Sequence, residues 1–293
     1  MAEGRIIKAT AGFYYADTGS AVVECKARGA LRMGSESPMA GDIVIFTPNG
    51  DKGVLEKILP RKNALVRPPV ANVDRVFIVS SMSLPAPNTL LIDRELAVCA
   101  KKGIEPIVVF NKSDDGDAER LKKIYGDAGY TAVVTSCKDG FGIEELKSYI
   151  ADGVNVFTGN SGVGKSSLLN LILPDATLKT GEVSLKLGRG RHTTRTTELY
   201  KLDGKYIADT AGFSSFDLES CETVTVTELP YTFKEFGEYA DKCRFTDCSH
   251  TCEKGCAVIE AVKEGKIDAG RHRNYCIIYD SIKDIDKWKF KKK

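Results

Sequence analysis

The spacing of apolar and polar positions divides the chain into three stretches, and the first stretch predicts short strands. Strand-like segments separated by Gly-rich turns are expected near residues 4–9, 12–15, 21–26 and 42–46. Several short strands in one small stretch are typical of a β-barrel, and the OB-fold is a common nucleic-acid-binding barrel of this size. We therefore predict an OB-like, RNA-binding β-barrel over residues 1–68. The alternative is a barrel whose task is not nucleic-acid binding.

The second stretch shows apolar runs that alternate with helical periodicity. It follows the segment Arg67-Pro68-Pro69, which disfavours both helix and central strand, so we place a domain boundary there. Such alternation predicts βαβ units around a parallel sheet, with ligands at the carboxyl ends of the strands. Strands are expected near 75–79, 106–111, 132–136 and 155–158, and helices near 88–102, 118–128, 143–150 and 165–173.

The third stretch loses this rhythm and gains a group of Cys and His residues. Helix-like segments follow near 257–265 and 271–287. The fold class is therefore multi-domain: an OB-like β-barrel, a central α/β domain over 69–220, and a mostly helical C-terminal module over 221–293.

Composition and charge narrow the class of protein. The chain of 293 residues is 42% hydrophobic and 28% charged, in the ordinary globular range, and no apolar run approaches the roughly 18 residues of a membrane span. The start has no apolar stretch typical of a secretory signal, so we expect a cytoplasmic protein without a membrane partner. The net charge of +2 does not decide for or against nucleic acid, but residues 186–195 and the tail from Lys283 are locally basic. A solvated surface is the alternative interpretation of both runs.

Residues 159–166 fit the phosphate-loop pattern G-x-x-x-x-G-K-[ST] between an expected strand and an expected helix. Such glycines let successive backbone N–H groups face a phosphate, Lys165 reaches the β- and γ-oxygens, and Ser166 offers its hydroxyl to Mg²⁺. A Gly-rich turn without a ligand is the alternative. The predicted phosphate-binding residues are Gly159, Asn160, Ser161, Gly162, Val163, Gly164, Lys165, Ser166 and Ser167.

Three further segments bear on the nucleotide, and two of them favour GTP over ATP. Asp209 and Gly212, at the end of a predicted strand, suit a Mg²⁺ shell and a γ-phosphate contact. The segment Asn111-Lys112-Ser113-Asp114 has the form [NT]-K-x-D, in which the aspartate accepts from the N1–H and the exocyclic amine of guanine. After the next strand, Ser136, Cys137 and Lys138 suit a backbone contact to guanine O6 and a cover for the base.

The order of these segments is unusual, because the guanine-reading segments precede the phosphate loop. The central domain is therefore predicted to be a circularly permuted P-loop GTPase domain. With the barrel, the segment 188–195 and the Cys/His-rich module, the chain resembles the RsgA family, circularly permuted GTPases of small ribosomal subunit biogenesis. The resemblance implies hydrolysis of GTP to GDP and phosphate with Mg²⁺, and a nucleotide-dependent switch in late maturation of the small (30S) subunit. Its partners would be that subunit and its rRNA, and we expect a monomer.

Two departures from common GTPases concern catalysis. Ala211 stands where the family usually has proline, and Phe213 stands where Ras-like enzymes use glutamine to orient water. Hydrolysis should therefore be slow or use another residue. We predict that His192 orients water, with a solvent or rRNA-phosphate contact as the alternative, and the resemblance points to Thr194 for the Mg²⁺ shell with Ser166 and Asp209. The candidate catalytic residues are His192, Thr194 and Lys165.

The Cys/His group predicts a metal site. Cys243-x4-Cys248-x-His250-x5-Cys256 places three thiols and an imidazole in one short loop, which favours a closed, structural tetrahedral Zn²⁺ site. Free or buried cysteines are the alternative, and four protein ligands argue against a catalytic zinc. The resemblance selects these four residues and leaves Cys252 outside.

Two other functions remain as alternatives. A P-loop kinase or transferase would need an acceptor site and a lid, for which the sequence offers no candidate. An RNA-binding module with a vestigial nucleotide site is disfavoured by the complete set of Lys165, Ser166 and Asp209. Nucleotide preference tests the first alternative, and stimulation of turnover by ribosomal subunits tests the second.

Overall fold

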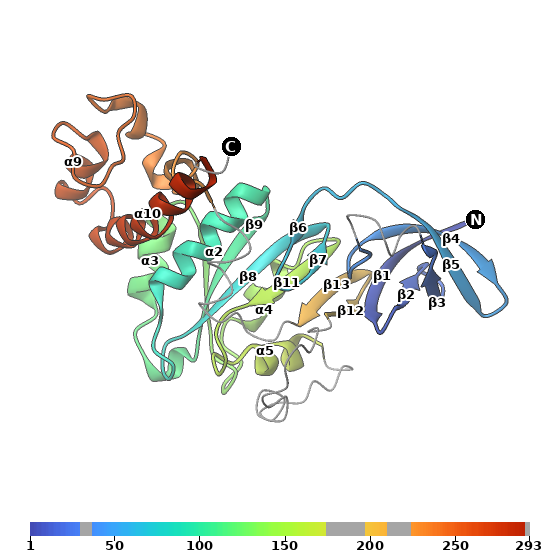
Figure 1. Cartoon of the computed structure of the whole chain (residues 1–293). Coiled ribbons are helices and arrows are strands. Elements are labelled where there is room, and N and C mark those ends of the chain that lie inside the picture. The colour runs from blue at the N-terminus through green and yellow to red at the C-terminus, as the bar shows by residue number, and fades with distance from the viewer. Residues whose placement is uncertain (30–36, 174–196, 210–223, 291–293) are drawn as a thin grey trace, which may run out of the picture. The chain divides into compact units, whose positions relative to one another are not determined.

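The structure is a computed structural model that describes residues 1–29, 37–173, 197–209 and 224–290, with only the backbone for Asp209 and 284–290. Its contacts divide the chain into two compact units (Figure 1). The first unit comprises Met1–Phe77 and Ile143–Phe213, and the second comprises Ile78–Gly142 and Ser214–Lys293. The domain boundaries expected at residues 68 and 220 stay a prediction.

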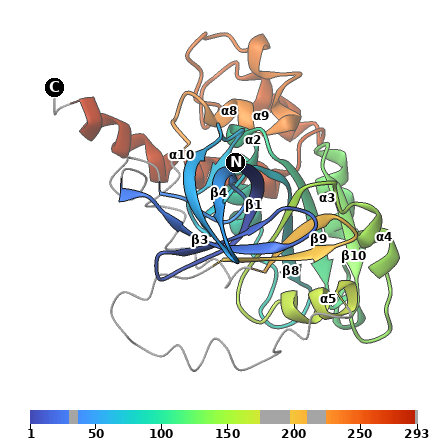
Figure 2. The ribbon, with the colours of Figure 1, turned by 90° about the vertical axis from the view of Figure 1, so that its right-hand side faces the viewer.

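The first unit begins with a five-stranded barrel. Its strands follow the order β1-β2-β3-β5-β4, and β1 also pairs with β4, which closes the barrel. Inside lies a small apolar core that includes Ile6, Cys25, Phe46 and Leu55. The barrel strands face the viewer in Figure 2. They are β1 (Ala2–Thr10), β2 (Phe13–Asp17), β3 (Val22–Ala27), β4 (Ile43–Asn49) and β5 (Lys52–Ile58).

The strand β5 and a short hairpin after it were not expected from the sequence. Gly53 of β5 lies so close to the core that an added Cβ would stand 2.7 Å from the sulfur of Cys25, so a side chain there has no room. The Pro-rich connector is not a bare linker, since β6 (Ala64–Leu65) and β7 (Val70–Ala71) pair within it. Asn72 donates from its side-chain amide to the carbonyl of Gly41, which fastens the connector to the barrel.

The rest of the first unit carries the phosphate loop on a continuation of the barrel sheet. β11 (Val154–Thr158) runs parallel to β13 (Lys205–Asp209), and β13 is antiparallel to β12 (Glu198–Leu202). β12 in turn pairs with β1 of the barrel. The helices α4 (Ile143–Ser148) and α5 (Lys165–Ile172) contact each other.

The second unit contains strands in the order β10-β9-β8, and β10 is parallel to β9. The strands are β8 (Val73–Ser81), which begins in the first unit, β9 (Glu105–Asn111) and β10 (Thr131–Thr135). The helix α2 (Thr89–Lys102) begins at Asn88, whose side chain accepts from the N–H of Leu91, and α3 (Glu119–Asp127) precedes β10. Nearly all residues of β9 and β10 are buried, as in sheets covered on both faces.

The C-terminal module of the second unit is mostly helical, as predicted. It comprises α8 (Leu229–Thr232), the 3₁₀ turns η2 (Lys234–Phe236) and η3 (Ala240–Lys242), α9 (Ala257–Lys263) and α10 (Ala269–Phe290). Its core gathers Leu229, Phe233, Phe236 and Tyr275, and it includes Ala97 of α2. Figure 1 shows α10 against α2. Within the described ranges, every helix is too short or too polar to cross a bilayer.

Candidate functional site

The predicted phosphate loop joins the buried strand β11 to α5. Gly159, Gly162 and Gly164 have φ angles of 131°, 82° and 95°, a region that side chains rarely adopt, which explains the glycines of the motif. The side chain of Lys165 is 7% exposed, and its Nζ donates to the carbonyls of Gly159 and Asn160 at 2.7 and 2.8 Å. The lysine is thus held over the loop, where an arriving phosphate can replace the carbonyls as acceptor.

The other predicted phosphate-loop residues lie around this lysine. Ser161 is exposed, Val163 is buried, and Ser166 and Ser167 are half-buried in the first turn of α5. The backbone of Asp209 pairs with Phe157 of the parallel strand β11, so β13 ends at the same edge of the sheet as the loop. The structure therefore brings the chain at Asp209 to the phosphate-loop edge.

Part of the prediction lies outside the described residues. His192, Thr194 and Gly212 belong to the stretches that the structure does not describe, as do Ala211, Phe213 and the basic segment 186–195. For Asp209 only the backbone is described.

In the second unit, Asn111 is the centre of the predicted guanine-reading segment. It ends β9 and is 1% exposed, and its Oδ1 accepts from the hydroxyl of Thr135 at 3.1 Å and from the thiol of Cys137 at 3.7 Å. These two donors fix the orientation of the amide. Lys112 has a φ of 61°, and its Nζ donates to the carbonyl of Leu84 at 2.7 Å. Thr135 directly precedes the predicted residue Ser136, and its contact with Asn111 was not expected from the sequence.

Asp114 lies beside the second guanine-reading segment. Its Oδ1 accepts from the hydroxyl of Ser136 at 3.1 Å, and its Oδ2 is 3.6 Å from the Nζ of Lys138. Gly142 closes this loop, because an added Cβ would stand 1.9 Å from the carbonyl oxygen of Val134. The structure thus brings together all six predicted residues at the carboxyl ends of β9 and β10.

The electrostatics of this cluster suit a guanine base. Burial raises the pKa of the Cys137 thiol, so the side chain stays a neutral donor to Asn111. The carboxylate of Asp114 is half-shielded and keeps acceptor capacity beyond the bond from Ser136. A carboxylate next to a fixed amide can accept from two neighbouring N–H groups of one ligand.

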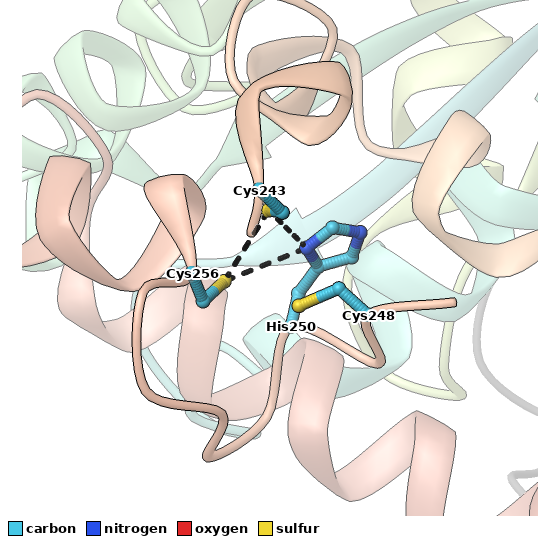
Figure 3. A group of neighbouring side chains, drawn as sticks. All are labelled: Cys243, Cys248, His250 and Cys256. Carbon is cyan, nitrogen blue, oxygen red and sulfur yellow. Dashed lines mark hydrogen bonds between the residues drawn. The ribbon is translucent and has the colours of Figure 1, made fainter. Parts of the chain in front are cut away.

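The four predicted metal ligands also converge (Figure 3). Their sulfur and ring nitrogen atoms all lie within 4.8 Å of one another. The Nδ1 of His250 is 3.5 Å from the sulfur of Cys243 and 3.5 Å from that of Cys256, and the two sulfurs are 3.8 Å apart. Cys248 completes the group, whereas Cys252 is exposed and outside it.

Burial disfavours the charged forms of these side chains. It raises the pKa of Cys248 to about 12 and lowers the pKa of His250, so the imidazole is in the neutral, ligating form. The thiols give up their protons when a metal binds. Three thiols and one imidazole at these separations fit tetrahedral zinc.

Glu253 organises the loop that carries the ligands, and sequence reasoning missed it. The backbone N–H groups of Ser249, Thr251 and Cys252 donate to its carboxylate at 2.8, 3.1 and 3.1 Å, and the Ser249 hydroxyl also donates to it. Although burial raises the pKa of Glu253, the bonds from Ser249 and its neighbours hold it at about 2. The loop is therefore folded around a permanent negative charge.

Comparison with known proteins decides the family. The family model "RsgA GTPase" matches residues 58–219, and "RsgA N-terminal domain" matches residues 3–55. The chain belongs to the RsgA GTPase family. It is 46% identical to the "Small ribosomal subunit biogenesis GTPase RsgA" of Caldanaerobacter subterraneus subsp. tengcongensis, over 99% of this chain and 98% of that protein. The protein of the same name from a Geobacillus species is 44% identical over 97% and 98% of the two chains.

Two solved structures share the fold of this RsgA-family chain. YjeQ from Thermotoga maritima superposes with a TM-score of 0.79 at 36% identity, covering 96% of this chain and 98% of that one. YloQ, described as a circularly permuted GTPase, gives 0.78 at 35% identity, covering 97% and 96%. These findings confirm the predicted resemblance, the multi-domain fold class with its permuted domain, and the prediction that the protein is a GTPase.

Proposed function

We propose that this RsgA-family chain hydrolyses GTP as a nucleotide-dependent switch in late maturation of the small ribosomal subunit. The observation that carries the proposal is the cluster in which Asn111, Asp114 and Ser136 are fixed by hydrogen bonds at the carboxyl ends of β9 and β10. Relatives similar over their full length carry this role in their names. A kinase or transferase is disfavoured because a guanine-reading cluster does not suit ATP.

The predicted residues of the two units would divide the work of binding the nucleotide. Asp114 would accept from the guanine ring, and the N–H groups of the phosphate loop and Lys165 would bind the phosphates. Mg²⁺, when bound, would neutralise charge on the phosphate oxygens, with Ser166, Asp209 and Thr194 as its protein neighbours. Gly212 would contact the γ-phosphate, and His192 would orient the attacking water.

The base assignment has a direct test in Asp114→Asn. This variant places a donor opposite the guanine N1–H and removes a charge-assisted pair, so GTP affinity should fall by about 2 to 4 kcal/mol and xanthine nucleotides should be preferred. Asp115→Asn is the matched control, because it removes the same charge one residue away. Unchanged GTP affinity in Asp114→Asn would remove this residue from the base site.

The switch has its own experiment. GTP turnover should be slow for the isolated protein and should rise with purified small ribosomal subunits, while ATP turnover should stay at background. His192→Ala should lower kcat on the subunit by roughly 10- to 1000-fold with little change in GTP affinity. Thr194→Ala should instead weaken Mg²⁺-dependent GTP binding. Equal kcat for wild type and His192→Ala would move the water-positioning role to the ribosome or the backbone.

We propose that Cys243, Cys248, His250 and Cys256 hold one structural Zn²⁺, which would cross-link the loop of the C-terminal module. The barrel and the basic segments would contact rRNA phosphates and stack on bases. We also propose that the protein is a cytoplasmic monomer whose domain boundaries lie at residues 68 and 220. One mole of zinc per chain is the expected result of metal analysis.

A further inference from the structure

Adjacent residues of helix α10 bond to two different parts of the second unit. Arg271 and Asn274 bond to the part of the second unit that carries the guanine-reading loops, while His272 and Tyr275 bond to the loop of the Cys/His cluster. The same helical turn therefore touches the surroundings of both proposed ligand sites.

Arg271 is a buried cation that bonds two carboxylates and lies against three aromatic rings. It is 2% exposed, its Nη1 donates to Asp93 of α2, and its Nε and Nη2 donate to Glu235 at 2.5 and 3.0 Å. Its guanidinium also lies 5.0 to 5.1 Å from the ring centres of three aromatic residues, which are Tyr125, Tyr130 and Phe233. A buried cation between two carboxylates keeps its place only while both partners remain, since an unpaired buried charge is costly.

From Arg271, a series of side-chain contacts leads to the predicted guanine-reading segment. Asp93 also accepts from the hydroxyl of Tyr125 at 3.0 Å and from the amide of Asn274 at 2.7 Å. The ring of Tyr125 packs against Phe110 with centroids 5.7 Å apart. Phe110 directly precedes Asn111, whose amide is fixed by Thr135 and Cys137.

In the other direction, the contacts lead to the Cys/His cluster. The Nε2 of His272 bonds the carbonyl of His250 at 2.8 Å, and the hydroxyl of Tyr275 donates to the carbonyl of Ser249 at 2.8 Å. These carbonyls belong to the loop that a metal would cross-link. When that loop loses its order, α10 loses two of its anchors.

We propose that Arg271 is a positioning residue for the guanine site, and that it links this site to the Cys/His cluster so that zinc and guanine nucleotide bind with positive cooperativity. The inference rests on the two sites proposed above. The two-state element is the C-terminal module, which is either docked through Arg271 on α2 and α3 or released. Zinc favours docking by ordering the loop that grips α10, and a bound nucleotide favours it by fixing the Asn111 segment. Because such linkage is reciprocal, each ligand must strengthen the other by the same factor.

The experiment measures both directions of the linkage on the full chain. GDP affinity is determined for the zinc-loaded protein and for protein stripped with a zinc-selective chelator in excess Mg²⁺. We expect a loss of about 3- to 10-fold on stripping, within the range of allosteric couplings. The affinity for zinc, measured by competition with the chelator, should rise by the same factor when GDP is present.

Variants then assign the linkage to Arg271. Arg271→Lys keeps the charge but loses the planar fork that donates twice to Glu235 and once to Asp93, so it should bind zinc and GDP with a linkage factor near one. Arg271→Met should do the same if its module folds, and the lysine variant decides if it does not. Arg273→Met is the matched control, because Arg273 lies exposed on the same helix and should keep the wild-type factor.

The outcomes separate the inference from the proposed function. Wild-type protein that binds both ligands with independent affinities would overturn the inference alone. Full linkage in Arg271→Lys would remove Arg271 from it. Failure of the wild type to bind GDP or zinc would overturn the proposed sites, and the inference with them.

Discussion

The N-terminal barrel and the C-terminal module are both small, but they are stabilised by different interactions. Backbone pairing around a closed set of strands forms the barrel, and a compact apolar core fills it. The C-terminal module has the long helix α10 beside shorter helices, four converging Cys and His side chains and a buried ion-pair network centred on Arg271. Substitution of one side chain should therefore destabilise a larger region in the module than in the barrel.

The same contrast appears where each part meets its neighbour within its unit. In the first unit, Asp17 of the barrel accepts from the hydroxyl of Tyr206 at 3.0 Å and pairs with Lys201 at 2.9 Å, but the lysine is substantially exposed. In the second unit, Arg271 and its two carboxylate partners are all buried. Water can solvate Asp17 when Lys201 is removed. The buried carboxylates that pair with Arg271 have no such replacement when the arginine is removed.

The largest effect is expected from breaking the Cys/His cluster. Cys248→Ser or chelation should unfold the module around α9 and the ligand loop, because structural zinc contributes about 10 kcal/mol or more of folding energy. The barrel, with its own core, should be unaffected, and GDP binding should weaken without being lost. Hydrogen exchange by region measures this, with Cys252→Ser as the matched control outside the cluster. Exchange that rises equally in the barrel would contradict the comparison.

The buried network should give the next largest effect. Arg271→Met leaves Asp93 and Glu235 without their cation, which for buried pairs costs about 3 to 5 kcal/mol. Lys201→Met, the corresponding change at the barrel edge, should cost clearly less, because Asp17 retains Tyr206 and the N–H of Gly19. Denaturant unfolding of both variants checks the order. A larger loss in Lys201→Met would reverse the contrast between the two parts.

How far the sequence predicts these parts depends on the distance over which their contacts act. The phosphate loop and the metal ligands are local patterns, and their residues follow directly from glycine conformations and ligand spacing. The pair of Asp93 and Arg271 joins positions 178 residues apart, and no local pattern marks either of them.

Other missed features have similar physical reasons. Strand β5 was missed because its alternating pattern is short and includes Gly53, which only the packed core explains. Glu253 looks like any surface acid until the loop folds its N–H groups around it. The Pro-rich segment predicted only a connector between domains. The β6–β7 hairpin was missed because it forms through strand pairing that no local pattern in this segment marks.

A substitution in the barrel core also tests the comparison between the barrel and the C-terminal module. Leu55 is fully buried between the barrel strands, and Leu55→Ala should cost about 2 to 5 kcal/mol through lost contacts and a cavity. The loss should appear as faster hydrogen exchange in β1 to β5, with zinc content unchanged. Val22→Ala, at an exposed position of the same barrel, is the control and should change little. Loss of zinc in Leu55→Ala would show that the two parts depend on each other more than their contacts indicate.

The smallest effect is expected at an exposed ion pair that fastens the module to α2. The bond from Lys101 at 2.8 Å, followed by the bonds from Thr225, lowers the pKa of Glu228 from 4.5 to about 2. A lowered folded-state pKa means that the carboxylate stabilises the fold fully above about pH 4.5 and loses this effect as the pH falls toward 2.

Glu228→Gln should therefore be slightly less stable than wild type at neutral pH, because the pair is half-exposed and screened by water. The difference in melting temperature should shrink steadily as the pH falls below about 4.5, since the wild type then loses the same charge. Comparing the two proteins at each pH cancels the loss of zinc in acid, which both share. Glu260→Gln, which breaks the pair with Lys263 inside α9, controls for the loss of any surface carboxylate. A difference that grows toward low pH would show that Glu228 is not held ionised by Lys101, and the link between α8 and α2 would then rest on apolar contacts alone.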